Sequence, residues 1–347
     1  MQKVRQLIRP EQIRELSLLL IIILIVIFFG SQIENYYSAR TFQRISSSVM
    51  IIMVVAVGET MVVLTRNIDL SVSSMVGFTA YLAGQQVSQN DNLSPAVVVL
   101  LAVSFGALLG LINGLLVAYG KIPAIVVTLG TLAIYRGALV EYGHSKNILV
   151  RDLPDWLVNL PRETLFSVGE LDIRLLAGLA FIIVIIFQMV LLFLPYGRRL
   201  YAIGSSPDAA RIAGLPARRI VLLAYVLCGA LSGLGGFIYL SRIGTVGTTA
   251  AQGLHMQVIA AVVVGGVNIF GGSGTMIGMM LGAILMGILE QSLIRMQINE
   301  FWKDAIFGMF ILLAVASDAL MMNRLRDLWA RGAIQMRIAQ DAAVQKE

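Results

Sequence analysis

Three consecutive stretches decide the fold class: RLLAGLAFIIVIIFQMVLLFLP (174–195), GRRLYAIGSSPDAARIAGLPARR (197–219) and IVLLAYVLCGALSGLGGFIYL (220–240). The first and third are apolar and long enough to cross a hydrocarbon core about 30 Å thick, which needs roughly 20 residues of helix. Both are continuous runs and do not alternate between polar and apolar residues, which favours helices over the strands of a barrel. The sequence therefore predicts an all-α, polytopic membrane protein.

Composition supports the same class. Of the 347 residues, 58% are hydrophobic and only 13% are charged, whereas a soluble domain is about 25% charged. The 33 glycines suit closely packed membrane helices. A single cysteine and two histidines leave little material for a disulfide or a metal centre, so we expect no metal and no cofactor in this chain. The net charge of +6 comes from residues at the ends of apolar spans and does not indicate nucleic acid.

The apolar runs predict about ten transmembrane helices. Two of the connections, near 66–69 and 271–273, are short enough to be breaks within a helix. We expect a cytoplasmic segment at 1–15, a membrane domain at 16–322 and a cytoplasmic tail at 323–347. The predicted spans are 16–33, 47–64, 70–88, 95–119, 122–141, 174–195, 220–240, 254–270, 274–294 and 302–320.

The distribution of Lys and Arg sets the expected orientation. We call the polar, arginine-rich segment 197–219 between two apolar runs the polar island. Sixteen of the 26 Lys and Arg residues fall on one side of the membrane if both termini share that side with the polar island. Cytoplasmic loops carry the excess of positive charge, so we expect both termini inside, the loop 196–219 in the cytoplasm and the segment 142–173 outside, in the periplasm.

The island also contains a short helix with its own start and stop signals. Ser206 can cap it, Pro207 suits the first helical position, Asp208 suits the positive end of the helix and Gly214 can close it. A capped, basic helix just below the bilayer is typical of a surface that docks a cytosolic partner.

A second polar group lies in VGETMVVLTRNIDLSVSS (57–74). Ionisable residues at membrane depth are costly and usually face a cavity or a partner. One interpretation is a discontinuous helix whose polar break lines a substrate path. The other is a cytoplasmic turn in which Arg66 and Asp69 form an ion pair, and the residues alone slightly favour this second interpretation. Asp69 or Ser71 could cap the following helix.

Three further motifs carry polar residues inside apolar stretches: KIPAIVVTLGTLAIYRG (121–137), QGLHMQVIAA (252–261) and GGVNIFGGSGTMIG (265–278). Helix packing explains most of the first, and the second could offer amide and imidazole donors to a sugar. The third lacks the G-K-[ST] ending of a phosphate loop, so the chain itself is not expected to hydrolyse a nucleotide. NIDLSVSSMVG (67–77) and NIFGGSGTMIG (268–278) also share residues at an offset of 201, a possible internal repeat.

Four blocks together carry a family resemblance: VGETMVVLTRNIDLSVSSMVGF (57–78), KIPAIVVTLGTLAIYRG (121–137), YGRRLYAIGSSPDAARIAGL (196–215) and IAAVVVGGVNIFGGSGTMIG (259–278). In this order they resemble the inner-membrane permeases of ribose-type ATP-binding-cassette (ABC) importers, over about 45–320. The spelling LTRNIDLSV (64–72) is most similar to the autoinducer-2 and rhamnose branch. Ser73 stands where many relatives carry glycine.

This resemblance implies a permease of the type II-like ABC importer class in the inner membrane. It implies a second permease subunit, identical or related, two cytosolic ATPase subunits that carry ATP and Mg²⁺, and a periplasmic sugar-binding protein. The coupling helix to the ATPase would be Ser206, Pro207, Asp208, Ala209, Ala210, Arg211, Ile212, Ala213 and Gly214. The expected translocation pathway would include Glu59, Asn67, Asp69, Ser71, Thr128, Gln252, His255 and Asn268.

The main alternative is an ion-coupled secondary transporter of a small polar solute. Such a transporter needs a titratable or sodium-binding group at membrane depth, and Glu59 with Asp69 is the only plausible pair in this sequence. An intramembrane enzyme is a more distant alternative, because the chain offers no catalytic set.

Overall fold

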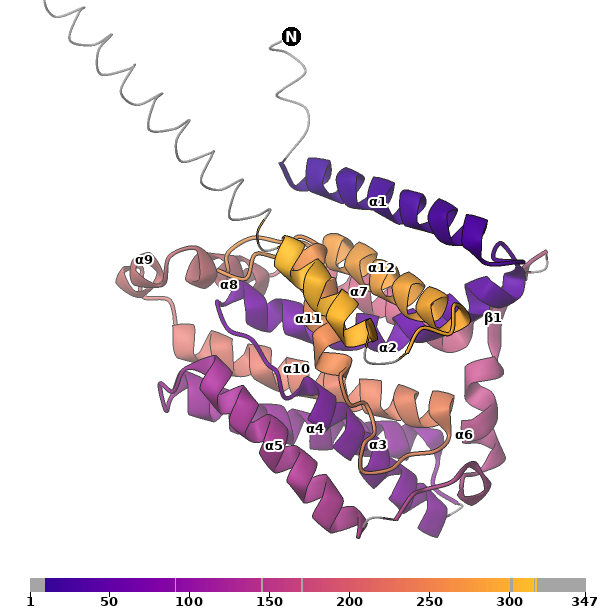
Figure 1. The fold of residues 1–347 in the computed structure, drawn as a ribbon. Helices are drawn as coiled ribbons and strands as arrows, with labels where there is room; N and C mark the ends of the chain where they lie inside the picture. Colours follow the sequence, from indigo (N-terminus) through magenta and orange to yellow (C-terminus); the bar gives the residue numbers. More distant parts are fainter. Residues whose placement is uncertain are drawn as a thin grey trace, which may run out of the picture.

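The computed structural model describes residues 10–90, 92–144, 146–169, 171–299, 302–314 and 316, and most of these residues are helical (Figure 1). The predicted tail at 323–347 lies outside the described residues. The long helices pack side by side into one bundle, with α2 and α10 among the central ones. Their bounds are α1 Pro10–Gln32, α2 Ala39–Leu64, α3 Val72–Gln89, α4 Pro95–Ala118, α5 Ala124–Gly143, α7 Leu175–Phe193, α10 Ala217–Ile243, α11 Leu254–Val264 and α12 Met276–Arg295.

The prediction of an all-α chain needs one correction, in the connection between α5 and α7. Besides the short helices η1 (Val150–Asp152), α6 (Asp155–Asn159) and η2 (Leu160–Arg162), this connection forms an antiparallel hairpin of β1 (Thr164–Val168) and β2 (Leu171–Arg174). Its first strand is rich in β-branched and aromatic residues, which favour strands. Gly169, with φ of 62°, supplies the left-handed turn residue that a tight hairpin requires.

Seven of the described helices are long and apolar enough to cross a membrane: α1, α2, α4, α5, α7, α10 and α12. The predicted span 254–270 is wrong in length, because α11 ends at Val264 and Gly266 turns the chain away with a φ of 88°. The predicted start of the second span is also too late: α2 begins at Ala39, where the side chain of Ser38 accepts a hydrogen bond from the Thr41 N–H.

Close helix packing in the bundle depends on glycine. Among the described helices, α4 and α10 make the most extensive contact, through Gly106 and Gly110 on one side and Gly229 and Gly233 on the other. A Cβ atom on Gly106 would lie 2.2 Å from the Gly229 carbonyl oxygen, so no larger residue fits. Small residues that allow backbones to approach are the usual device for packing helices in lipid.

Burial separates the central helices from the peripheral ones. In the most apolar stretch of α2, 94% of the residues are buried inside the protein, whereas the corresponding fractions are only 17% in α1 and 28% in α7. The outward faces of α1 and α7 therefore present apolar side chains to the surroundings, as expected for helices that contact lipid.

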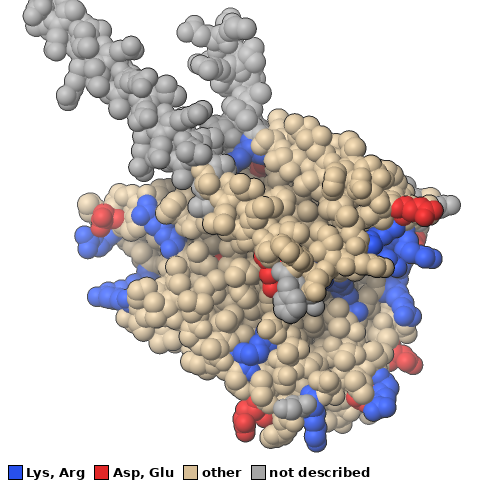
Figure 2. Space-filling view, in the orientation of Figure 1, with Lys and Arg blue, Asp and Glu red and all other residues tan. Residues whose placement is uncertain are grey.

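Contacts bring the ends of several helices together at one end of the bundle. The Arg14 side chain at the start of α1 donates to the Gly266 carbonyl (3.0 Å), and the Leu64 carbonyl at the end of α2 accepts from the Gly272 N–H (3.1 Å). The Ser205 hydroxyl, at the end of α8 (Pro195–Ser205), donates to the Gly272 carbonyl (3.3 Å) and precedes α9 (Pro207–Ile212). We call this the α9 end and the opposite one the hairpin end. Figure 2 shows Lys and Arg side chains at the left edge, around α8 and α9, and at the right edge, around β1.

Candidate functional site

A buried carboxylate lies in the break between α2 and α3. Asp69 is fully buried, and its Oδ1 atom accepts hydrogen bonds from the Ser71 N–H (2.9 Å) and the Ser71 hydroxyl (2.6 Å). The amide of Asn113, on α4, donates to Asp69 Oδ2 (3.2 Å) and to the Ser71 hydroxyl oxygen (2.9 Å). The side chain therefore receives the several donors that a buried carboxylate needs.

A second carboxylate adjoins the first. Glu59, on α2, is fully buried, and its Oε1 atom accepts from the Asp69 N–H (3.0 Å). The Cys228 thiol, on α10, donates to Glu59 Oε2 (3.8 Å). Among the described residues no Lys or Arg forms an ion pair with either acid, and no group of three His, Cys, Asp or Glu is placed to hold a metal ion. Two acids buried this close together are costly, and buried acids of this kind mark functional sites in membrane proteins.

Helix α5 completes the cluster. The Tyr135 hydroxyl lies within hydrogen-bond distance of the Leu109 carbonyl (2.9 Å) and of Asn113 Oδ1 (3.1 Å). The Thr128 hydroxyl lies in the same way between the Ala124 carbonyl (2.9 Å) and the Ile68 carbonyl in the break (3.2 Å). We call Glu59, Asp69, Ser71, Asn113, Thr128 and Tyr135 the buried polar cluster. Sequence reasoning missed Asn113 and Tyr135. The available signal was Asn113 itself, a lone amide in the apolar run ALLGLINGLLVA (107–118).

The interpretation of Arg66 and Asp69 as an ion pair is wrong. Arg66 points away from Asp69 and donates from Nε to the Gly204 carbonyl (2.5 Å) and from Nη2 to the Ser205 carbonyl (2.9 Å). These are unpaired carbonyls in the last turn of α8, where a cation is also favoured by the helix dipole. Ser71 is the N-cap residue of α3 without a capping bond from its side chain, because its hydroxyl donates to Asp69. The segment 65–71 is thus a break between two helices.

The other predicted pathway residues do not join the cluster. His255 Nδ1 lies 3.1 Å from the hydroxyl of Ser73, which is in the first turn of α3, two residues beyond Ser71. The Asn67 amide donates to the Thr65 carbonyl (3.0 Å), and Asn268 Oδ1 accepts from the Phe270 N–H (2.9 Å), so both side chains stabilise their own loops. Gln252 is exposed.

The predicted helix in the polar island is present as α9. The Ser206 hydroxyl oxygen accepts from the Ala209 N–H (3.3 Å), Pro207 is the first helical residue, and Gly214 has a φ of 71° beyond the last turn. The Ala210 side chain is buried in the protein, whereas Ile212 is 85% exposed. A large apolar side chain this exposed, on a capped helix at the end of the bundle, is suited to a protein contact.

The two segments of the suggested internal repeat, 67–77 and 268–278, begin at neighbouring helix breaks, and the helices before them end in the same way. The Asn67 N–H donates to the Val62 carbonyl, and the Val267 N–H donates to the Val262 carbonyl, with Arg66 and Gly266 in left-handed conformations. This is a Schellman ending in both cases. The matching endings differ by 266 − 66 = 200 positions, whereas the sequence motifs match at 201.

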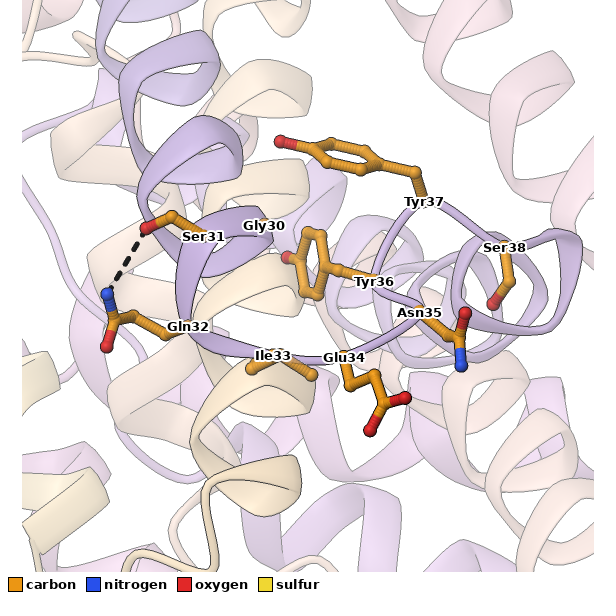
Figure 3. Close-up of a pocket in the computed structure, with 9 residues that line it drawn as sticks. All are labelled: Gly30, Ser31, Gln32, Ile33, Glu34, Asn35, Tyr36, Tyr37 and Ser38. Carbon is orange, nitrogen blue, oxygen red and sulfur yellow. Dashed lines mark hydrogen bonds between the residues drawn. The ribbon is translucent and has the colours of Figure 1, made fainter.

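A cavity of about 620 Å³ at the connection of α1 and α2 is a poor candidate for the site. Nine consecutive residues, 30–38, line it, so it is the concave side of one loop (Figure 3). Tyr36 anchors this loop through a hydrogen bond with the Ser292 hydroxyl (2.8 Å), and its ring lies under the Arg295 guanidinium at 5.9 Å. Burial raises the pKa of the Tyr36 phenol, so the group is neutral at ordinary pH.

Comparison with known proteins agrees with this architecture. Residues 41–315 match the family described as branched-chain amino acid transport system / permease component. The chain is 35% identical over 325 residues to the autoinducer 2 import system permease protein LsrC of Salmonella typhi, a match covering 92% of this chain and 90% of the relative. It is 36% identical over 323 residues to the protein of the same name from Escherichia coli O9:H4 (strain HS), covering 92% of each chain.

No solved structure matches the chain. The family match spans most of the sequence, from the first turn of α2 to beyond α12, and includes the buried polar cluster and α9. The resemblance to ribose-type ABC importer permeases is thereby confirmed, and with it a multi-pass location in the inner membrane. The chain belongs to the branched-chain amino acid transport system / permease component family and is a permease subunit of an ABC importer.

Proposed function

We propose that this permease imports autoinducer-2 or a similar small sugar-like compound, handed over by a periplasmic binding protein. The relatives named for autoinducer 2 import, at 35% and 36% identity over nearly the whole chain, support this substrate class. They support an importer subunit over the ion-coupled transporter. ATP and Mg²⁺ bind to two separate cytosolic ATPase subunits, and a second permease subunit, identical or related, completes the membrane part.

The proposed topology has about ten spans with both termini in the cytoplasm. Seven long helices, the 18-residue α3, the short α11 and the helical residues 302–314 supply the ten. The α9 end faces the cytoplasm, because this orientation puts sixteen of the 26 Lys and Arg residues of the sequence on that side, five of them in the loop 196–219. Those in the described residues are Arg14, Arg66, Lys121, Arg198, Arg199, Arg211, Arg218 and Arg219.

Helix α9 is the proposed coupling helix. The observation that carries this role is that one of its side chains is buried in the permease while another, two positions further on, is exposed. Ala210 is buried, whereas Ile212 is 85% exposed. The exposed Asp208 and Arg211 lie 3.6 Å apart beside it. Exposed ion pairs contribute little to stability, so these charges are available to a partner. Ile212 would insert into the ATPase subunit as the apolar anchor.

Replacing Ile212 with Asp is expected to abolish co-purification of the ATPase subunits and, with it, ATP-dependent uptake. The change buries a carboxylate in an apolar contact, which typically costs several kcal/mol. The control is Leu165→Asp, an equally drastic change at an exposed position of β1 at the hairpin end. Normal co-purification and normal uptake with Ile212→Asp would contradict the proposed role of α9.

The driving force has its own test. Uptake by the assembled transporter is expected to persist when the membrane potential and proton gradient are collapsed and to stop when ATP is depleted. The reverse pattern would favour the ion-coupled alternative, with Glu59 and Asp69 as the coupling groups.

The proposed mechanical route runs from α9 into the buried polar cluster through backbone contacts. Arg66 holds the last turn of α8 through the Gly204 and Ser205 carbonyls, and the Leu64 carbonyl accepts from the Gly272 N–H. We call Leu64, Arg66, Gly204, Ser205 and Gly272 the junction. Only two residues lie between Arg66 and Asp69, so a displacement of α9 would move the break that holds the buried carboxylate.

A further inference from the structure

A second cavity, of about 900 Å³, lies at the hairpin end and has an unusual lining. It is formed by the first three turns of α2, by η2, by the end of β2, by the last turn of α10 and by α12. We call it the arginine cavity, because five of its nine lining residues are arginines and none is acidic. The lining residues are Arg40, Gln43, Arg44, Ser47, Pro161, Arg162, Arg174, Arg242 and Gln291.

Part of this lining is fixed in place. Arg242 donates from Nη2 to the Ser48 hydroxyl oxygen (2.8 Å), and the Gln291 amide donates to the same oxygen (2.5 Å). The Arg174 guanidinium donates to the Arg162 carbonyl. The inner wall is therefore held by hydrogen bonds between helices, and a ligand would meet donors that are already oriented.

The remaining guanidinium groups have no partners among the described residues. Arg40, Arg44 and Arg162 form no ion pair or side-chain hydrogen bond there, and all three are exposed. Two neighbouring acids, Asp172 and Glu290, do not line the cavity. Asp172 accepts from Gln43 (3.3 Å) and Ser167 (2.8 Å), and Glu290, on α12, interacts electrostatically with Arg242 alone among the five arginines. Five cations around one cavity repel one another, and an anion placed among them would relieve that repulsion.

The lining chemistry favours a carboxylate-bearing protein surface over a lipid. Pro161 is the sole apolar residue of the lining, so acyl chains would find no apolar wall. The helices beneath it, α2, α10 and α12, are the buried ones of the bundle, while the lipid-exposed α1 contributes no lining residue. Guanidinium groups bind carboxylates in a bidentate manner, and several at once would suit a cluster of Asp and Glu.

We propose that the arginine cavity receives acidic side chains of the extracytoplasmic binding protein and so seats it over the permease. This inference rests on the proposed function, which places the hairpin end outside the cytoplasm and names a binding protein as partner. Complementary charge of this kind accelerates encounter and fixes the orientation of the docked protein, and both effects weaken as salt rises.

The test measures binding of the ligand-loaded binding protein to the permease–ATPase complex in nanodiscs of zwitterionic lipid. The variant Arg44→Glu is expected to weaken binding by at least about tenfold at low salt, and less at high salt. The control is Arg151→Glu, which makes the same charge change at an exposed position of the hairpin end outside the cavity. Arg162→Glu provides a second variant from a different wall.

Each outcome decides the proposal. Loss of affinity in Arg44→Glu and Arg162→Glu, with Arg151→Glu unchanged, supports it. Equal affinity of the binding protein for all variants overturns it. The proposed function is tested by different measurements, ATP-dependent uptake and ATPase co-purification with the unaltered chain. A failure of the proposed function can therefore be distinguished from a failure of this inference.

Discussion

Replacing Gly204 with Ala is expected to disconnect ATP hydrolysis from import. The added Cβ atom would lie 1.9 Å from the Leu64 carbonyl oxygen and 2.4 Å from the Gly272 nitrogen. Both neighbours are backbone atoms, so no side chain can turn aside and the junction must open. Overpacking of this kind typically costs about 1–3 kcal/mol. The hydrogen bond between Leu64 and Gly272 (3.1 Å) would break first, because both of its atoms adjoin the added carbon.

The measurement compares uptake with ATPase activity in the same reconstituted transporter. We expect uptake to fall at least about tenfold, which corresponds to about 1.4 kcal/mol, while ATP hydrolysis and ATPase co-purification are retained. Gly130→Ala is the matched control, because a Cβ atom there has no neighbour within 4 Å and alanine favours a helix. If uptake and hydrolysis fall together, or neither falls, the junction does not transmit the motion of α9.

Arg66→Met gives an independent test of the same junction without adding volume at Gly204. Methionine keeps much of the length of the side chain but removes the two donors to the α8 carbonyls. Each such bond from a charged group contributes about 1.5–3 kcal/mol, so uptake is expected to fall while hydrolysis remains. A normal uptake rate in this variant would limit the role of Arg66 to local structure.

Much of the fold could be predicted from the sequence because each long apolar run had to become a helix in lipid. Helix α9 was also predictable, since Ser206, Pro207 and Gly214 act locally and their effects do not depend on the rest of the chain. The lengths of the broken helices were not predictable in the same way. Whether the glycines at 265 and 266 end α11 or continue it depends on packing against α12, where a Cβ on Gly265 would meet the Gly278 carbonyl at 2.5 Å.

The candidate site was half predictable for a related reason. Glu59 and Asp69 stand out because charges are rare in apolar runs, yet their partners come from elsewhere in the chain. Asn113 is 44 positions from Asp69, and Gly204 is 138 positions from Arg66. Nothing near Arg66 in the sequence distinguishes an ion pair with Asp69 from a hydrogen bond to the end of α8. The hairpin β1–β2 was missed because nine strand residues in a membrane protein of this composition give only a weak local pattern.

Replacing Asp69 with Asn should sharply reduce uptake while the protein still inserts into the membrane. The new side chain has nearly the same shape but exchanges one acceptor oxygen for an NH₂ group. It would then face the Asn113 amide, which now donates to Asp69, and the Ser71 hydroxyl. At least one buried donor would lose its partner, at a cost of about 1–3 kcal/mol. We expect uptake per inserted molecule to fall at least about tenfold, with a lowered melting temperature in detergent.

The control for Asp69→Asn is Thr79→Val, because the Thr79 hydroxyl is buried without a hydrogen-bond partner among the described residues. Valine has the same shape, so uptake and melting temperature should be unchanged or slightly raised.

The Glu59→Gln variant separates a structural role of the buried polar cluster from a role in substrate passage. Glutamine can still accept from the Asp69 N–H and would lose only the long contact with the Cys228 thiol (3.8 Å), so a purely structural cluster would tolerate it. If Glu59→Gln imports normally and Asp69→Asn loses melting temperature but not uptake, the cluster holds the break in place and the substrate passes elsewhere. If both variants melt normally and lose uptake, the carboxyl groups in the break are themselves required for passage, because a loss of stability would not explain the loss of uptake.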